Sequence, residues 1–135
     1  MIPLSKSKLT IISVSVLVIY WGFLAVMTSL PASNLPSVEL SDKLIHTGAF
    51  FVLGFLMVFT FSIQTRYRLL NERAGFFMLA AGLLYAAMDE LHQMYIPGRS
   101  ADILDFVADG IGLLLGLALF ILFKVVLARK NISLL

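Results

Sequence analysis

The sequence LTIISVSVLVIYWGFLAVMTSL, residues 9–30, contains no charged side chain. A helix rises about 1.5 Å per residue and the hydrocarbon core of a bilayer is roughly 30 Å thick, so about 20 apolar residues cross it. This stretch is therefore long enough to span a membrane. It exceeds the apolar core of a usual signal peptide, about 7–15 residues, and no A-x-A cleavage site follows it. We therefore expect it to remain as a span.

Three further apolar stretches predict three more membrane-spanning helices. Residues 44–63 are interrupted only by His46, near their start. The run that begins at residue 74 reaches two acidic residues before it is long enough, so it spans only if its helix continues to about Ile96. Residues 103–128 are long enough, although two aspartates lie in their first two turns. The predicted helices are thus about 9–30, 44–63, 74–96 and 103–128.

The composition of the whole chain indicates the same class of protein. Of its 135 residues, 60% are hydrophobic and 13% are charged, and the mean hydropathy is +0.98. An ordinary soluble domain has about 45–50% apolar and about 25% charged residues. The absence of cysteine excludes disulfides, thiolate metal sites and cysteine nucleophiles. We predict one domain over residues 1–135, an all-α integral membrane four-helix bundle.

The charged residues divide unequally between the two ends of such a bundle. One end, with a net charge of +7, would carry Lys6, Lys8, Arg66, Arg68, Glu72, Arg73, Lys124, Arg129 and Lys130. The other end, with a net charge of −5, would carry Glu39, Asp42, Lys43, Asp89, Glu90, Arg99, Asp102, Asp105 and Asp109. Because basic residues mark cytoplasmic loops, both termini are expected to be cytoplasmic and the acidic end is expected outside.

The first polar segment at the acidic end opens the second predicted span. Asp42 and His46 are four residues apart and therefore share one face of a helix. A purely structural role is also available to them. Ser41 or Asp42 is a suitable N-cap, and His46 would then hydrogen-bond Asp42 one turn back. Against that reading, polar groups within the membrane boundary are costly, and His46 lies there.

The second polar segment ends the third predicted span. Asp89 and Glu90 are adjacent and so point about 100° apart on a helix, which lets one face inward while the other meets water. Gln93 follows one turn later. The Pro-Gly pair at 97–98 is a turn signal that would bring Arg99 back over the helix ends. The alternative is a solvated loop whose charges have no function.

The third segment places three carboxylates and two glycines on one face of the last predicted span. Asp102, Asp105 and Asp109 form an acidic stripe, which continues in register as Gly112 and Gly116. Small residues four apart let helix backbones approach closely in lipid, within the bundle or between two copies of the chain. Asp109 lies deep enough to be a functional candidate, and the alternative is a buried aspartate that only fixes helix packing.

Because of the predicted topology, these segments meet in one polar chamber open to the exterior. Three states of the chamber are consistent with its residues. A divalent cation, Mg²⁺ or Ca²⁺ given the oxygen-rich ligands, would be held by carboxylates and His46. Alternatively the carboxylates are protonated and act as acids, or Arg99 and Lys43 clamp them into a neutral network.

Taken in order, these residues resemble the VanZ-like family of small bacterial membrane proteins. The resemblance covers roughly residues 35–120 and rests on Asp42-Lys43-x-x-His46, Glu90-x-x-Gln93, Pro97-Gly98-Arg99-Ser100 and Asp105-x-x-x-Asp109-x-x-Gly112-x-x-x-Gly116. The family takes its name from a bacterial protein associated with low-level resistance to the glycopeptide teicoplanin. The resemblance implies a protein of the bacterial cytoplasmic membrane that is concerned with envelope or lipid-linked material at the outer leaflet.

The first functional hypothesis is a site that binds, or also modifies, a lipid-linked cell-wall intermediate or lipoglycopeptide among membrane lipids. In it, Glu90 or Asp105 is the general acid or base, Arg99 the anion clamp, and His46 a proton carrier paired with Asp42. The remaining binding candidates are Lys43, Asp89, Gln93, Asp102 and Asp109. The second hypothesis is a non-catalytic scaffold with a structural polar cluster, and the third an ion- or proton-coupled carrier. Nucleic acid is not expected as a partner, and the sequence leaves open whether the protein is an enzyme.

Overall fold

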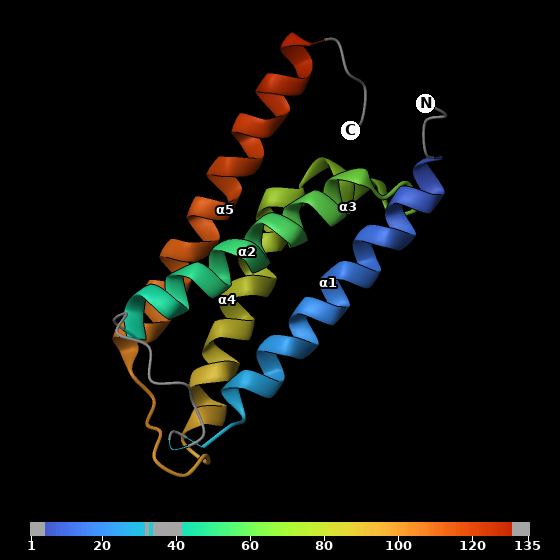
Figure 1. Ribbon diagram of the computed structural model, residues 1–135. Helices are drawn as coiled ribbons and strands as arrows, with labels where there is room; N and C mark the ends of the chain where they lie inside the picture. Colours follow the sequence, from blue (N-terminus) through green and yellow to red (C-terminus); the bar gives the residue numbers. More distant parts are fainter. Residues whose placement is uncertain (1–4, 32, 34–41, 131–135) are drawn as a thin grey trace.

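The computed structural model describes residues 5–31, 33 and 42–130, and in this part the chain is all-helical apart from its connections. The four long helices are α1 (Lys6–Thr28), α2 (Asp42–Ile63), α4 (Ala74–Gln93) and α5 (Ile103–Arg129), and a short α3 (Arg68–Glu72) joins α2 to α4 (Figure 1). Each of the four long helices is long and apolar enough to cross a membrane. The chain is therefore a multi-pass membrane protein.

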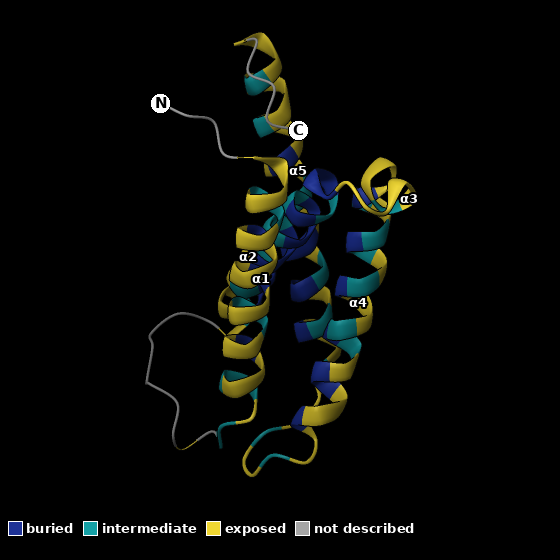
Figure 2. Cartoon of the chain, turned by 90° about the vertical axis from the view of Figure 1, so that its right-hand side faces the viewer, coloured by how far each residue is buried: buried dark blue, intermediate teal, exposed yellow. Residues whose placement is uncertain are grey.

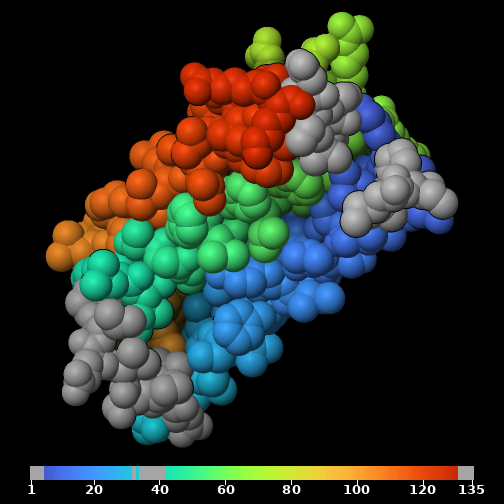
Figure 3. Space-filling view, turned by 45° about the horizontal axis from the view of Figure 1, so that its top comes forward, coloured from blue at the N-terminus to red at the C-terminus, as the bar shows by residue number. Residues whose placement is uncertain are grey.

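Helix α2 lies at the centre of the arrangement and contacts every other helix. Helix α1 packs along one side of α2 and α5 along the other, as the space-filling view shows (Figure 3). The start of α1 and the end of α5 lie at one end of the bundle (Figure 1). The start of α2, the end of α4 and the start of α5 lie at the opposite end, so the polar segments of the sequence share that end.

The apolar core lies between α2, α4 and α5, and Leu17 and Leu24 of α1 also belong to it. Its largest fully buried side chains include Leu53 and Met57 of α2, Met78 of α4 and Leu113 of α5. The outward faces of the helices are exposed (Figure 2). Large apolar side chains belong to them, such as Ile19, which is 72% exposed. A helix with apolar side chains on its outer face is suited to lipid contact, which agrees with the composition of the chain.

Two glycines of α5 bring its backbone into contact with α2. A Cβ atom at Gly112 would lie 2.4 Å from the carbonyl oxygen of Thr47, and one at Gly116 would lie 2.6 Å from that of Phe51. The glycines therefore permit the close approach that their spacing predicted. Within the chain, the backbone of α2 lies against both glycines.

The helix boundaries differ from the predicted ones at several points. The third span ends at Gln93 rather than Ile96, because the amides of Tyr95 and Ile96 bond carbonyls three residues back and Gly98, with φ 77°, turns the chain away. The expectation that it must reach Ile96 to span is wrong, since its 20 residues are already long and apolar enough. The connection 64–73, expected as a loop, contains α3. The first span is shifted by two to three residues, to Lys6–Thr28, and the second begins two residues early, at Asp42. The fourth ends one residue later than predicted, at Arg129.

Candidate functional site

The structure brings residues of all three polar segments together at one end of the bundle. They come from the first two turns of α2, the last turn of α4, and the N-cap and first two turns of α5. Six of the charged or polar side chains there are at most 8% exposed: His46, Asp89, Glu90, Gln93, Asp105 and Asp109. Buried polar groups at such a density must find partners within the protein. The proposed N-cap Ser41 and the acidic Glu39 lie outside the described residues.

Lys43 joins α2 to the start of α5. Its Nζ lies 2.5 Å from Oδ2 of Asp102 and 2.5 Å from Oδ1 of Asp105. Asp102 is also the N-cap of α5, since its Oδ1 accepts a hydrogen bond from the amide of Leu104. The bonds from Lys43 and Leu104 hold the pKa of the Asp102 carboxyl below its usual value. Of the two basic residues expected to clamp the carboxylates, Lys43 therefore contacts two of them, Asp102 and Asp105.

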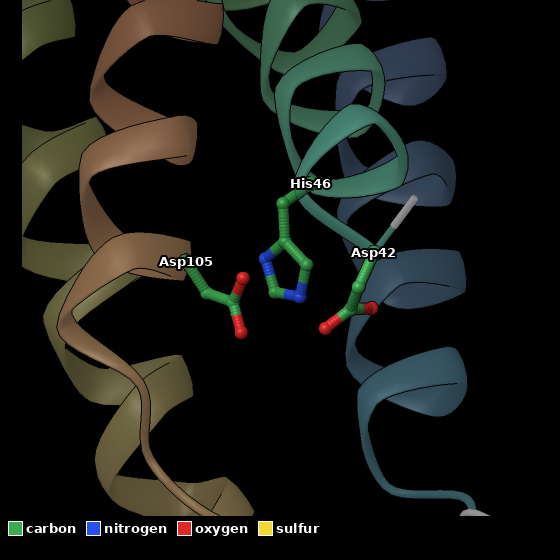
Figure 4. A group of neighbouring side chains, drawn as sticks. All are labelled: Asp42, His46 and Asp105. Atoms are coloured by element: carbon green, nitrogen blue, oxygen red, sulfur yellow. The ribbon is translucent and has the colours of Figure 1, made fainter. Parts of the chain in front are cut away.

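His46 pairs with a different carboxylate from the one that its spacing suggested. Its Nδ1 lies 3.0 Å from Oδ1 of Asp109, on α5, and this replaces the expected hydrogen bond to Asp42. The reason is the glycine-lined contact of α2 with α5, which brings the two side chains together. The ring nevertheless lies between Asp42 on one side and Asp105 on the other, as Figure 4 shows.

The adjacent acids Asp89 and Glu90 point in different directions, but neither meets water. Glu90 is 7% exposed and its Oε2 accepts a hydrogen bond of 2.8 Å from the amide of Asp102. Asp89 is 4% exposed and accepts one of 3.0 Å from Nε2 of Gln93, one turn later. The expectation that one of the two would be solvated is wrong, because Glu90 packs against the residue that precedes α5 while Asp89 lies among side chains of α1, α2 and Arg99.

Arg99 returns over the helix ends as the turn signal predicted, but its partners are not carboxylates. Its guanidinium donates to the carbonyls of Leu30 and Met27, at 3.1 and 3.2 Å, and to Oε1 of Gln93 at 3.3 Å. Met27 lies in the last turn of α1 and Leu30 lies two residues beyond its end, where carbonyls lack partners further along a helix. Arg99 therefore closes the end of α1 and ties it to α4. Three of its five N–H groups are used in the described part of the chain.

A cavity of about 260 Å³ lies between α1, α2 and α4, next to this polar cluster. Its polar end is formed by Asp42, His46, Asp89 and Arg99. The remainder is mostly apolar and is lined by Phe23, Leu24, Met27, Ile45, Ala49 and Phe50, with Thr28 and Tyr85. One cavity thus combines charged groups at one end with an apolar wall, the arrangement found in sites for amphipathic ligands.

The contribution of α1 to this cavity was not predicted. Phe23, Leu24 and Met27 line it, and Trp21 packs edge-on against Tyr85 with ring centroids 5.2 Å apart. In sequence, α1 offers only uniform hydropathy, because lipid-facing and protein-facing residues are both apolar. The one available signal was the cluster of aromatic residues at 20–23, and it does not specify a partner.

Among the described residues, two groups of side chains have the composition and spacing to hold a metal ion. Asp42, His46 and Asp105 form one, and His46, Glu90 and Asp109 form the other, with the donor atoms in each group within 4.8 Å of one another. In addition, Oε1 of Glu90 and Oδ2 of Asp109 are buried without a hydrogen-bond partner. Glu90 and Asp105 are the two residues predicted as general acid or base. Glu90 has one oxygen without a hydrogen-bond partner among the described residues, whereas Asp105 accepts a hydrogen bond from Lys43.

Comparison with known proteins agrees with these features. The VanZ/LLP1 family matches residues 6–124, which is nearly the whole chain and includes every residue of the polar cluster. No curated protein and no solved structure matches the chain. Since the match covers far more than half of the sequence, the chain belongs to the VanZ/LLP1 family.

Proposed function

We propose that this protein binds a lipophilic or lipid-linked molecule of the bacterial cell envelope in the cavity between α1, α2 and α4. The observation that carries the proposal is the division of that cavity into a charged end and an apolar wall. A ligand with a polar head and a hydrocarbon portion would satisfy both. A volume of about 260 Å³ accommodates part of such a molecule, with the rest of its chain left in the bilayer.

The charged end favours a head group that carries an anionic or strongly polar function. Arg99 keeps two N–H groups that no described residue uses, and its planar fork suits a phosphate or carboxylate. Asp42 and Asp89 line the same end and would accept hydrogen bonds from hydroxyl or amine groups. A head group with both kinds of function, such as a phosphorylated sugar, matches this set.

The proposal includes the outer face of the bacterial cytoplasmic membrane as the place of binding. It is supported by the charge distribution, since the end that holds the cavity is acidic and the opposite end is basic. The connection to glycopeptide resistance that the family resemblance implies is part of the same proposal. A protein that captures lipid-linked envelope material, or the lipophilic drug itself, at that surface would alter sensitivity to a drug such as teicoplanin.

The direct test is native mass spectrometry of the protein purified in mild detergent. We expect a lipid-sized adduct on the wild type and its loss in Ala49→Phe, because Ala49 lines the cavity and the larger ring would fill it. Ala25→Phe is the matched control, since Ala25 is exposed on α1 and does not line the cavity. Equal adducts on both variants would refute binding in this cavity.

A scaffold without a ligand is the second candidate function, and one observation favours it. The bonds of Lys43 to Asp102 and Asp105, and of Asp102 to Glu90, join the ends of α2, α4 and α5. Glu90→Gln and Arg99→Ala separate the two functions in a bacterium whose teicoplanin sensitivity depends on the protein. Loss of resistance at wild-type abundance and thermal stability supports the binding site, whereas a loss that parallels a fall in stability supports the scaffold.

A further inference from the structure

Three buried side chains from three different helices converge beside the cavity. They are His46 of α2, Glu90 of α4 and Asp109 of α5, with exposures of 8%, 7% and 0%. One donor atom of each lies within 4.8 Å of a donor atom of the other two. Their positions depend on the glycine-lined contact between α2 and α5, which fixes His46 against Asp109 at 3.0 Å.

Two carboxylate oxygens of this group are left without a donor. Oε1 of Glu90 and Oδ2 of Asp109 are buried and have no hydrogen-bond partner in the described part of the chain. Leaving a buried acceptor unsatisfied is costly, and more so for a charged one. The nearby ammonium of Lys43 is already 2.5 Å from both Asp102 and Asp105. Among the described residues, no lysine or arginine is bonded to either oxygen, and His46 is bonded to the other oxygen of Asp109.

We propose that His46, Glu90 and Asp109 bind a divalent first-row transition-metal cation such as Mn²⁺ or Zn²⁺. Two carboxylates balance the charge of the ion, and the imidazole favours a transition metal over the Mg²⁺ or Ca²⁺ that oxygen ligands alone would suggest. Three protein ligands leave at least one coordination position for water or for a polar group of a ligand. The site does not require the lipid, so the two proposals stand or fall separately.

Access and orientation are consistent with this role. His46 lines the cavity between α1, α2 and α4, whereas Glu90 lines a groove between α4 and α5, so the three ligands lie between two openings. The imidazole ring also has a carboxylate on either side, Asp42 and Asp105 (Figure 4). A second carboxylate that accepts the remaining ring N–H commonly orients a metal-bound histidine.

The other candidate group, Asp42, His46 and Asp105, is less suited to an ion. Asp105 is bonded to the ammonium of Lys43, which would be displaced or repelled by a cation on the same carboxylate. Asp42 is exposed, so its oxygens can be hydrated without a metal. The two buried carboxylate oxygens without a partner among the described residues, Oε1 of Glu90 and Oδ2 of Asp109, both belong to the proposed group and not to this one.

The test uses the full-length protein in detergent, freed of metal by chelation, with Mn²⁺ alone as the probe. Electron paramagnetic resonance of free Mn²⁺ measures binding, and we expect about one ion per chain, displaced by Zn²⁺. Glu90→Gln and Asp109→Asn, which keep the side-chain shape, should each weaken binding by at least about tenfold. Asp105→Asn, which alters the other group and a carboxylate beside the His46 ring, should weaken binding less than either of these variants. Asp102→Asn removes a carboxylate that belongs to neither group and should leave binding within a few-fold of wild type.

A second measurement identifies the nitrogen ligand. The chain has two histidines, so a pulsed resonance signal from imidazole nitrogen coupled to Mn²⁺ can be assigned by single variants. The signal should vanish in His46→Gln and persist in His92→Gln, because His92 is exposed and hydrogen-bonds Ser29. Absence of stoichiometric Mn²⁺ and Zn²⁺ binding to wild type, a nitrogen signal that survives His46→Gln, or loss of binding in Asp105→Asn but not in Glu90→Gln would each overturn the proposal.

Discussion

Asp102 uses its two carboxylate oxygens for two different purposes. Oδ1 accepts a hydrogen bond of 2.8 Å from the amide of Leu104 and so caps α5, while Oδ2 lies 2.5 Å from the ammonium of Lys43. Both contacts favour the ionised carboxylate, and they lower the pKa of Asp102 from its ordinary value of 3.8. A group whose pKa is lower in the folded protein stabilises the fold while it is ionised.

This stabilisation has a predictable dependence on pH. It is fully present above pH 3.8 and is lost as the pH falls through the lower pKa of the folded state. Asp102→Asn retains a good N-cap but removes the charge, so its thermal stability in detergent should fall less than that of the wild type on acidification below pH 4. Parallel curves of melting temperature against pH for the two proteins would contradict this account.

For individual residues, the sequence shows which side chains are polar but not which of them hydrogen-bond one another. His46 is four residues from Asp42, and that spacing favoured a bond within α2. The bond to Asp109 depends instead on how closely α2 approaches α5, which is a property of two helices. Likewise, Arg99 was expected near carboxylates, yet it donates to the carbonyls of Met27 and Leu30, because every helix end leaves such acceptors open whatever its sequence.

Among the helices, the contact of α5 with α2 determines the geometry of the whole polar cluster. A Cβ at Gly112 would lie 2.4 Å from Thr47 O and 2.8 Å from Phe51 N, both backbone atoms that cannot turn aside. Gly112→Ala should therefore separate the helices and cost about 1–3 kcal/mol of stability, as overpacking does. It should also lower the affinity for Mn²⁺ by moving His46 away from Asp109.

The matched control for that prediction is Gly48→Ala on α2. A Cβ there meets nothing within 4 Å, so the only expected effect is the better helix propensity of alanine, up to about 1 kcal/mol of stabilisation. Thermal unfolding of both variants in the same detergent measures the difference. Equal stability of Gly112→Ala and Gly48→Ala would show that the helices are not in backbone contact at Gly112.

The long helices could be predicted from the sequence because a membrane span is a local property of about 20 residues. Helix α3 could not, since its five residues are positioned by bonds to other segments. The side chain of Asn71 donates to the carbonyls of Ser62 and Gln64 at the end of α2, and Gln64 in turn bonds the backbone of Tyr67. The contribution of α1 to the cavity was missed for a similar reason, because uniform hydropathy in α1 does not show which face packs against α2.

For the whole molecule, the two ends of the bundle differ in charge. The start of α1, the end of α5 and the connection between α2 and α3 lie at one end of the bundle (Figure 1). This end carries most of the basic residues. The polar cluster and the cavity occupy the other, acidic end. Basic residues are retained in the cytoplasm during insertion, so the acidic end should face the exterior.

Single cysteines can test this orientation, because the chain contains no cysteine of its own. Ser100 and Thr65 are both exposed and lie outside the helices, Ser100 at the acidic end and Thr65 at the basic end. A maleimide that cannot cross membranes should label Ser100→Cys on intact spheroplasts and Thr65→Cys only after permeabilisation. The reverse pattern would place the cavity at the cytoplasmic face. That result would refute the proposal that the protein captures its ligand at the outer leaflet. The fold and the proposed metal site would be unaffected, because neither depends on which side of the membrane the polar cluster faces.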